Sequence, residues 1–142
     1  MGEAKEKMVI TRKAAFSASH VCRIDSLSDA ENHELFGEEA NPNGHGHNYV
    51  LEVSVEGQVD PVTGMVMNLK ELKDILEEEI VEPMDHRFLN REVPPFDKVV
   101  PTTANLAKEI WGRLENRFAE SGKALVRVRV HETPDFFVDV TR

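Results

Sequence analysis

Alternating apolar and polar residues predict four β-strands. A weak alternation covers residues 8–20, and in residues 49–56 every odd-numbered residue is apolar. Val126, Val128 and Val130 alternate with polar side chains, and residues 136–141 follow a Thr-Pro-Asp turn. A period of two is typical of strands that bury one face, so these segments are the expected sheet.

A period of three to four residues predicts two helices. Asn68 is an N-cap with Glu71 in the third position, and the apolar stripe that follows is expected to stop at Pro83. A second helix is expected after Pro101-Thr102-Thr103, with Gly122 just past its end. The two stripes are Leu69, Leu72, Ile75, Leu76 and Ile80, and Leu106, Ile110, Leu114 and Phe118.

The order of these elements is β-β-α-α-β-β. It predicts an α+β fold in which the helices cover one face of an antiparallel sheet. Residues 23–43 show no period and are expected to form a long functional loop. We expect one domain over residues 1–142, with residues 1–7 flexible.

Charge and composition narrow the class of protein. Seventeen basic against 26 acidic side chains give a net charge of −9, which argues against nucleic acid or an anionic membrane as partner. The single cysteine, Cys22, suits a reducing compartment. The charged N-terminus resembles no secretory signal, and no apolar run could span a bilayer. We therefore expect a cytoplasmic protein.

Three histidines carry the candidate chemistry. His45 and His47 stand two residues apart, so on a strand both rings project from the same face. With His20 from the end of another strand they form a three-histidine set with one open position, as in catalytic zinc sites. The alternative is that all three are ordinary turn and strand residues. The distant His20 and the glycines at 44 and 46 favour a metal site.

Six short motifs extend this pattern along the chain. They are Phe16-Ser17-Ala18-Ser19-His20, Phe36-Gly37, Asn41-Pro42-Asn43-Gly44-His45-Gly46-His47-Asn48-Tyr49, Asp60-Pro61-Val62-Thr63-Gly64-Met65-Val66, Met84-Asp85-His86 and His131-Glu132-Thr133. Together, and in this order, they resemble the 6-pyruvoyl-tetrahydropterin synthase family, which includes the 6-carboxy-tetrahydropterin synthases. The resemblance runs from about Thr11 to Thr141.

The resemblance implies a tunnelling fold, in which small β-β-α-α-β-β subunits share sheets to form a barrel. It implies a homohexamer of two stacked trimers, with active sites between subunits. It also implies zinc held by His20, His45 and His47, and 7,8-dihydroneopterin triphosphate as the small-molecule substrate.

Further site residues follow from the same resemblance. Asp85 and His86 correspond to a pair that reaches into a neighbouring subunit's site, although both are also common turn residues. Glu132 corresponds to the carboxylate that anchors the pterin, although alone it could be a solvated strand charge. Thr102 and Thr103 are helix caps that in the family also touch the pterin.

The chain departs from the family at two positions. Glu39 stands where the family has its catalytic cysteine, with Glu38 as the competing candidate if the loop alignment slips by one residue. Ala104 replaces a common acidic residue after the paired threonines. Cys22 lies two residues past His20, and we interpret it as a small apolar residue, with a role as the base the weaker alternative.

A glutamate base changes the expected reaction. Its reference pKa of about 4.3, against about 8.5 for a thiol, makes it a weak base for carbon-bound protons but an adequate one for a metal-acidified hydroxyl. This favours retro-aldol cleavage to 6-hydroxymethyl-7,8-dihydropterin, which relatives with glutamate at this place make for folate synthesis. The alternatives are 6-pyruvoyl-tetrahydropterin, 6-carboxy-tetrahydropterin leading to queuosine, or a non-catalytic protein that binds zinc or pterin.

Overall fold

The computed structural model describes residues 6–142, so the flexibility expected of residues 1–7 lies mostly outside the described residues. The elements in chain order are β1 (Met8–His20), α1 (Asp29–Phe36), η1 (Gly37–Ala40), β2 (His45–Gly57), α2 (Leu69–Leu76), η2 (Glu77–Val81), α3 (Glu82–Met84), β3 (Arg87–Phe88), α4 (Leu89–Glu92), α5 (Thr103–Glu120), β4 (Ala124–Thr133) and β5 (Phe136–Thr141).

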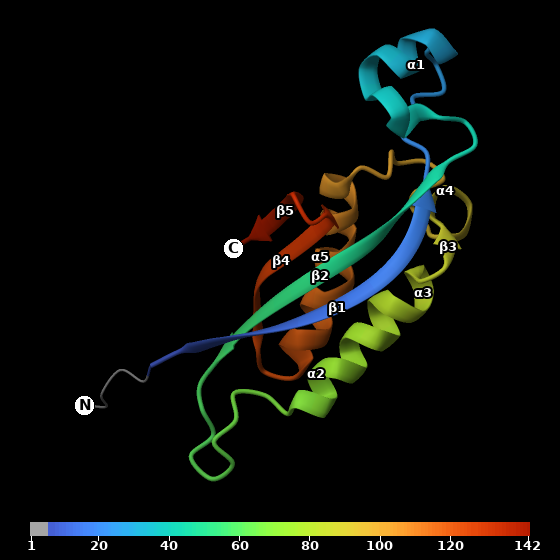
Figure 1. The fold of residues 1–142 in the computed structure, drawn as a ribbon. Coiled ribbons are helices and arrows are strands. Elements are labelled where there is room, and N and C mark those ends of the chain that lie inside the picture. Colours follow the sequence, from blue (N-terminus) through green and yellow to red (C-terminus); the bar gives the residue numbers. More distant parts are fainter. Residues whose placement is uncertain (1–5) are drawn as a thin grey trace.

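The sheet has the strand order β3-β1-β2-β4-β5. All four predicted strands are present and pair antiparallel, and the two-residue β3 adds a short parallel pairing to β1. The helices α2 and α5 lie on the same side of the long β1–β2 pair (Figure 1). The prediction of an α+β fold with helices on one face of the sheet is therefore confirmed.

The expectation of a plain loop over residues 23–43 is wrong, because α1 and η1 lie within it. Ser28 and Glu31 form a reciprocal capping box at the start of α1, but Asn32 is the only buried residue of that helix. A helix held by its cap, without an apolar face, leaves no period in the sequence. Figure 1 shows α1 standing away from the sheet.

The first predicted helix does not stop before Pro83. It continues through the π-helical segment η2 into α3 and ends at Met84. Proline is tolerated in the first turn of a helical segment, where no backbone donor is needed. The chain changes from π-helical to α-helical hydrogen bonding at Glu82. Pro83 therefore lies in the first turn of α3.

The strand register places the histidines at one end of the core. Even-numbered residues of β1 and odd-numbered residues of β2 face the helices, as the buried Phe16 and Tyr49 show. His20 pairs directly with His45, and Ala18 pairs with His47. All three imidazoles therefore share the core face of the sheet. Among the described residues, no helix is both long and apolar enough to cross a membrane.

Candidate metal centre

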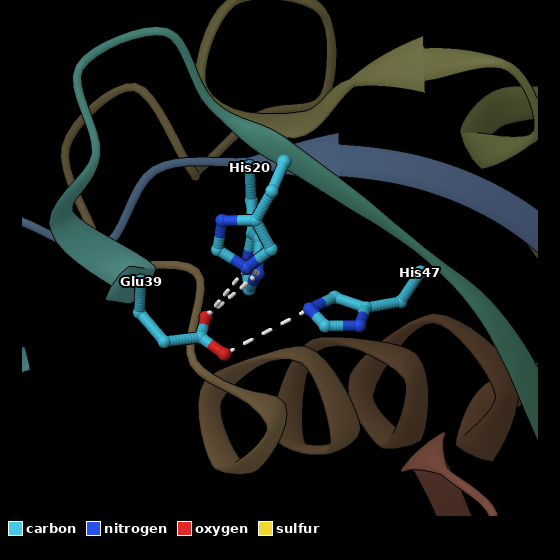
Figure 2. A group of neighbouring side chains, drawn as sticks. His20, Glu39 and His47 are labelled. Carbon is cyan, nitrogen blue, oxygen red and sulfur yellow. Dashed lines mark hydrogen bonds and ion pairs between the residues drawn. The ribbon is translucent and has the colours of Figure 1, made fainter. Parts of the chain in front are cut away.

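The three histidine side chains converge on one point. Nε2 of His20 lies 3.1 Å from Nε2 of His45, and the ring of His47 is centred 5.1 Å and 4.8 Å from the other two rings. The carboxylate of Glu39 lies beside them (Figure 2). The potential ligand atoms of His20, Glu39, His45 and His47 all lie within 4.8 Å of one another.

Gly46 allows β2 to lie this close to β1. A Cβ atom built on it would stand 3.3 Å from the carbonyl oxygen of Ala18, which is tighter than most side chains tolerate. Gly46 stands between His45 and His47 and has no side chain that could push β2 away from β1. The two histidines on either side of it can therefore stay close to His20.

His20 is fully buried and is oriented by the backbone. Its Nδ1 lies 2.7 Å from the carbonyl oxygen of Pro101, which can only accept a hydrogen bond. Nδ1 therefore carries the proton, and in the neutral ring Nε2 presents a lone pair to the cluster. Burial lowers the pKa of His20 and also that of His47. Both shifts favour the neutral imidazole, which is the form that binds metals.

Glu39 reaches the cluster from η1. One carboxylate oxygen lies 2.9 Å from Nε2 of His20 and 3.1 Å from Nε2 of His45, and the other lies 3.8 Å from Nε2 of His47. The backbone N–H of Cys22 donates to the carbonyl oxygen of Glu39 at 2.8 Å and so ties η1 to the end of β1. The competing candidate, Glu38, is exposed.

This donor set suits a divalent transition metal. Three imidazole nitrogens and a carboxylate oxygen are the ligands that zinc and its neighbours take in proteins. Nε2 of His47 and Nδ1 of His45 are also buried without a hydrogen-bond partner among residues 6–142. Buried polar atoms normally have partners, and a cation at the cluster would supply one for His47.

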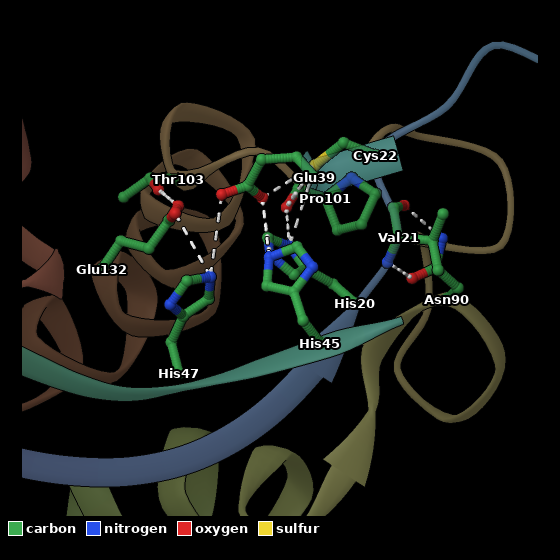
Figure 3. Close-up of polar contacts among 10 residues, drawn as sticks. All are labelled: His20, Val21, Cys22, Glu39, His45, His47, Asn90, Pro101, Thr103 and Glu132. Carbon is green, nitrogen blue, oxygen red and sulfur yellow. Dashed lines mark hydrogen bonds and ion pairs between the residues drawn. The ribbon is translucent and has the colours of Figure 1, made fainter. Parts of the chain in front are cut away.

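A cavity of about 270 Å³ adjoins the cluster and contains most of the other predicted site residues. Glu132 lies here, accepts a hydrogen bond from the hydroxyl of Thr103, and has an oxygen 3.3 Å from Nε2 of His47. The cavity is lined by Cys22, Phe36, Glu39, Thr102, Thr103, Ala104, Glu132, Phe136 and Val138. Figure 3 shows Thr103 and Glu132 beside His47.

Cys22 lies beside the cluster, where it also lines the cavity. Its sulfur is buried and lies 3.8 Å from each of Nδ1 of His20, a Glu39 carboxylate oxygen and the carbonyl oxygen of Pro101. Burial, assisted by the charge of Glu39, raises the pKa of Cys22 to about 12. A thiol so hard to ionise is a poor general base at neutral pH.

Asp85 and His86 do not meet the cluster within one chain. Both bind the backbone of Ser17, whose N–H donates to the Asp85 carboxylate at 2.8 Å and whose carbonyl oxygen accepts from the N–H of His86 at 2.6 Å. The His86 side chain is 83% exposed. The His86 imidazole therefore points to solvent, whereas the Asp85 carboxylate stays bound to β1, at the edge that carries β3.

The sequence did not predict two groups that position the site residues. The carbonyl oxygen of Pro101 orients His20, and a backbone group leaves no signal in residue type. Asn90 binds both backbone groups of the buried Val21, accepting from its N–H at 2.8 Å and donating to its carbonyl oxygen at 2.9 Å (Figure 3). It thereby fixes the chain between His20 and Cys22.

We expect Asn90→Leu to weaken the site by freeing this segment. The substitution leaves two buried backbone groups without partners, at a cost of about 1–3 kcal/mol for each unsatisfied group. The free energy of unfolding should fall in a denaturant titration, and metal affinity should fall with it. Asn43→Ala, in an exposed turn, is the control and should change neither quantity. Wild-type behaviour of Asn90→Leu would show that Val21 needs no such support.

Comparisons with known proteins agree with this geometry. The family model described as 6-pyruvoyl tetrahydropterin synthase matches residues 9–142. The human 6-pyruvoyl tetrahydrobiopterin synthase is 48% identical over 129 residues, which cover 91% of this chain and 88% of the human protein. The structure of the Caenorhabditis elegans 6-pyruvoyl tetrahydropterin synthase matches with a TM-score of 0.89 and 36% identity over 97% of each chain.

A more distant structure shares the fold alone. It is the Plasmodium vivax 6-pyruvoyltetrahydropterin synthase, in a variant whose catalytic glutamate is replaced by cysteine. It matches with a TM-score of 0.63 and 16% identity, over 97% of this chain and 99% of that chain.

Proposed function

Because the chain belongs to the 6-pyruvoyl tetrahydropterin synthase family of pterin-biosynthesis lyases, we propose that it is a zinc-dependent enzyme acting on 7,8-dihydroneopterin triphosphate. The observation that carries the proposal is the convergence of three histidines and Glu39 beside a cavity that contains Glu132. A histidine-rich metal site that adjoins an open cavity suits catalysis better than a structural role.

In this proposal His20, His45 and His47 hold the zinc ion. The bound ion would lower the pKa of a substrate hydroxyl and stabilise negative charge on its oxygen. Glu132 would accept two hydrogen bonds from the amidine-like edge of the pterin, held in place by the hydroxyl of Thr103. Thr102 caps α5 through the N–H of Asn105 and supports this corner.

Glu39 is the proposed general base, and its identity favours carbon–carbon cleavage. Glu39 takes the proton of the 2′-hydroxyl, the C1′–C2′ bond breaks, a carbonyl forms at C2′, and C1′ takes up a proton. The products are 6-hydroxymethyl-7,8-dihydropterin and an aldehyde that keeps the triphosphate. The Plasmodium vivax protein with a catalytic glutamate supports a carboxylate base within this fold.

The second candidate reaction is triphosphate elimination to 6-pyruvoyl-tetrahydropterin. The 48% identity with a human protein of that name favours it. It requires proton movements on the side-chain carbons, for which a carboxylate is the weaker base. Formation of 6-carboxy-tetrahydropterin and a non-catalytic role in binding zinc or pterin are the remaining alternatives.

The deciding experiment is a product analysis. Purified zinc-loaded protein is incubated with 7,8-dihydroneopterin triphosphate, and the products are identified by mass. We expect 6-hydroxymethyl-7,8-dihydropterin as the main product. Free triphosphate together with 6-pyruvoyl-tetrahydropterin would establish the second candidate, and unchanged substrate would establish a binding protein.

We further propose that the site is completed between subunits of a homohexamer. The His86 ring points to solvent beside the half-buried Asp85, and within residues 6–142 the edge strands β3 and β5 each have one side free to pair with another chain. An exposed carboxylate–imidazole pair is a sound proton-transfer unit when a second subunit covers it.

Mixing two inactive variants tests this assembly. His86→Ala protein and Glu39→Ala protein should each be inactive, and subunit exchange between them should restore activity, because some sites then hold both wild-type residues. Sizing chromatography of each variant is the control for assembly. A monomeric protein, or a mixture that stays inactive after proven exchange, would contradict the shared site.

A further inference from the structure

Glu39 faces both the histidine cluster and the neighbouring cavity. Its carboxylate is within 4 Å of all three Nε2 atoms, and the same residue lines the cavity that contains Glu132. Figure 2 shows the carboxylate turned toward the histidine rings, with its contact to His47 drawn across the group. A residue whose only task was to accept a substrate proton would not need contacts with all three imidazoles.

The cluster gathers more hydrogen-bond acceptors than donors at short distances, as the contacts of His20, His45 and Glu39 show. His20 donates through Nδ1 to the Pro101 carbonyl oxygen, so the neutral ring turns a lone pair toward Glu39 at 2.9 Å. An ionised carboxylate is also only an acceptor. His45 Nε2 lies 3.1 Å from both groups, and one proton on it could bridge only one of these contacts at good geometry. A cation held among these atoms would be a partner for each of the acceptors.

We propose that Glu39 is a fourth protein ligand of the metal when no substrate is bound, and that it leaves the metal when a substrate hydroxyl takes its place. The inference rests on the proposed metal site and deepens the role of one of its residues. Structural zinc sites are closed by four protein ligands, whereas catalytic zinc sites keep one position for water or substrate. A carboxylate that alternates between the two states reconciles both requirements.

The surroundings of Glu39 leave room for this movement. Its side chain is one-third exposed, and it projects from the short η1 turn beside a cavity of about 270 Å³. The backbone stays anchored by the hydrogen bond from Cys22, so a rotation of the side chain alone suffices. In the released position the carboxylate would remain next to the substrate hydroxyl and could accept its proton.

The test uses cobalt as a spectroscopic replacement for zinc. Metal-free wild-type, Glu39→Gln and Glu39→Ala proteins are titrated with Co²⁺ against a coloured chelator, and the visible spectrum of each complex is recorded. Glu38→Gln removes the adjacent exposed carboxylate and is the matched control for charge. The probe for the substrate site is 7,8-dihydroneopterin, which carries the side-chain hydroxyls without the triphosphate.

We expect both Glu39 variants to bind Co²⁺ at least about tenfold more weakly than wild type, since even outer-shell partners of a metal contribute roughly 10–100-fold. Their spectra should differ from wild type alone and converge with it after 7,8-dihydroneopterin is added. Wild-type affinity and spectrum in both variants would overturn the inference. Spectra that stay distinct with the pterin bound would overturn the release of Glu39.

The proposed function fails by a different result. If Glu39→Gln binds Co²⁺ like wild type but loses turnover at saturating metal, the fourth-ligand role is wrong and the base role stands. If the wild-type protein binds no Co²⁺, the metal site itself is wrong.

Discussion

Replacing His47 by alanine should release the metal and abolish turnover while leaving the fold intact. The variant loses one of the three imidazoles of the cluster, so metal affinity should fall by more than the roughly 10–100-fold that loss of an outer-shell partner costs. The core consists of apolar side chains from the sheet, the helices and the connecting segments, and none of the three histidines belongs to it. The free energy of unfolding should therefore change only within the ordinary range of roughly 0.5–3 kcal/mol.

The measurements are metal content after dialysis, turnover, and the unfolding transition followed by circular dichroism. His33→Ala is the matched control, because His33 is an exposed histidine of α1 outside the cluster. It should keep metal, activity and stability. Full metal content in His47→Ala would remove His47 from the ligand set, and global unfolding would show that the metal is structural.

Alternation made the strands predictable, and the same rule explains one local error. The valine pattern predicted that Val126 faces the core, but Leu125 is the buried residue. The register between β2 and β4 shifts between Ser54 and Val55. This bulge turns the residues of β4 before Arg127 to the opposite face of the sheet, so that Leu125 is buried in place of Val126. A bulge depends on the partner strand, so the sequence of one strand alone cannot indicate it.

The convergence of the three histidines was predictable for a related reason. His45 and His47 share a face because they stand two residues apart on a strand, and both strands were recognisable from their apolar residues. His20 joins them because the β1–β2 register pairs it with His45. No local pattern sets that register, so the sequence indicated His20 only by its position at the end of an apolar strand, and the family resemblance then implied the same residue.

Contacts made by the backbone or between distant loops could not be predicted. The hydrogen bond from Cys22 to Glu39 brings η1 to the cluster, and it joins segments that share no pattern. The same holds for Asn90, which binds Val21 across 69 positions of the chain. The exposed direction of His86 depends on a positive φ of 60°, a conformation that residue type alone rarely indicates outside glycine.

Substitutions of Glu39 should decide which reaction the site catalyses. Glu39→Gln keeps the shape of the side chain but cannot accept a proton, so turnover at saturating metal should fall by about 10²–10⁴. Glu39→Cys should shift the products from 6-hydroxymethyl-7,8-dihydropterin toward 6-pyruvoyl-tetrahydropterin, because a thiolate is the stronger base for carbon-bound protons. The ratio of the two products, measured by mass, is the readout.

Two controls separate Glu39 from its neighbours. Glu38→Gln should keep wild-type turnover, because Glu38 is exposed outside the cluster. Cys22→Ala should also change turnover little, since burial keeps this thiol protonated, with its pKa raised to about 12. If Cys22→Ala abolishes turnover while Glu39→Gln retains it, Cys22 is the base and the argument for carbon–carbon cleavage from a carboxylate fails.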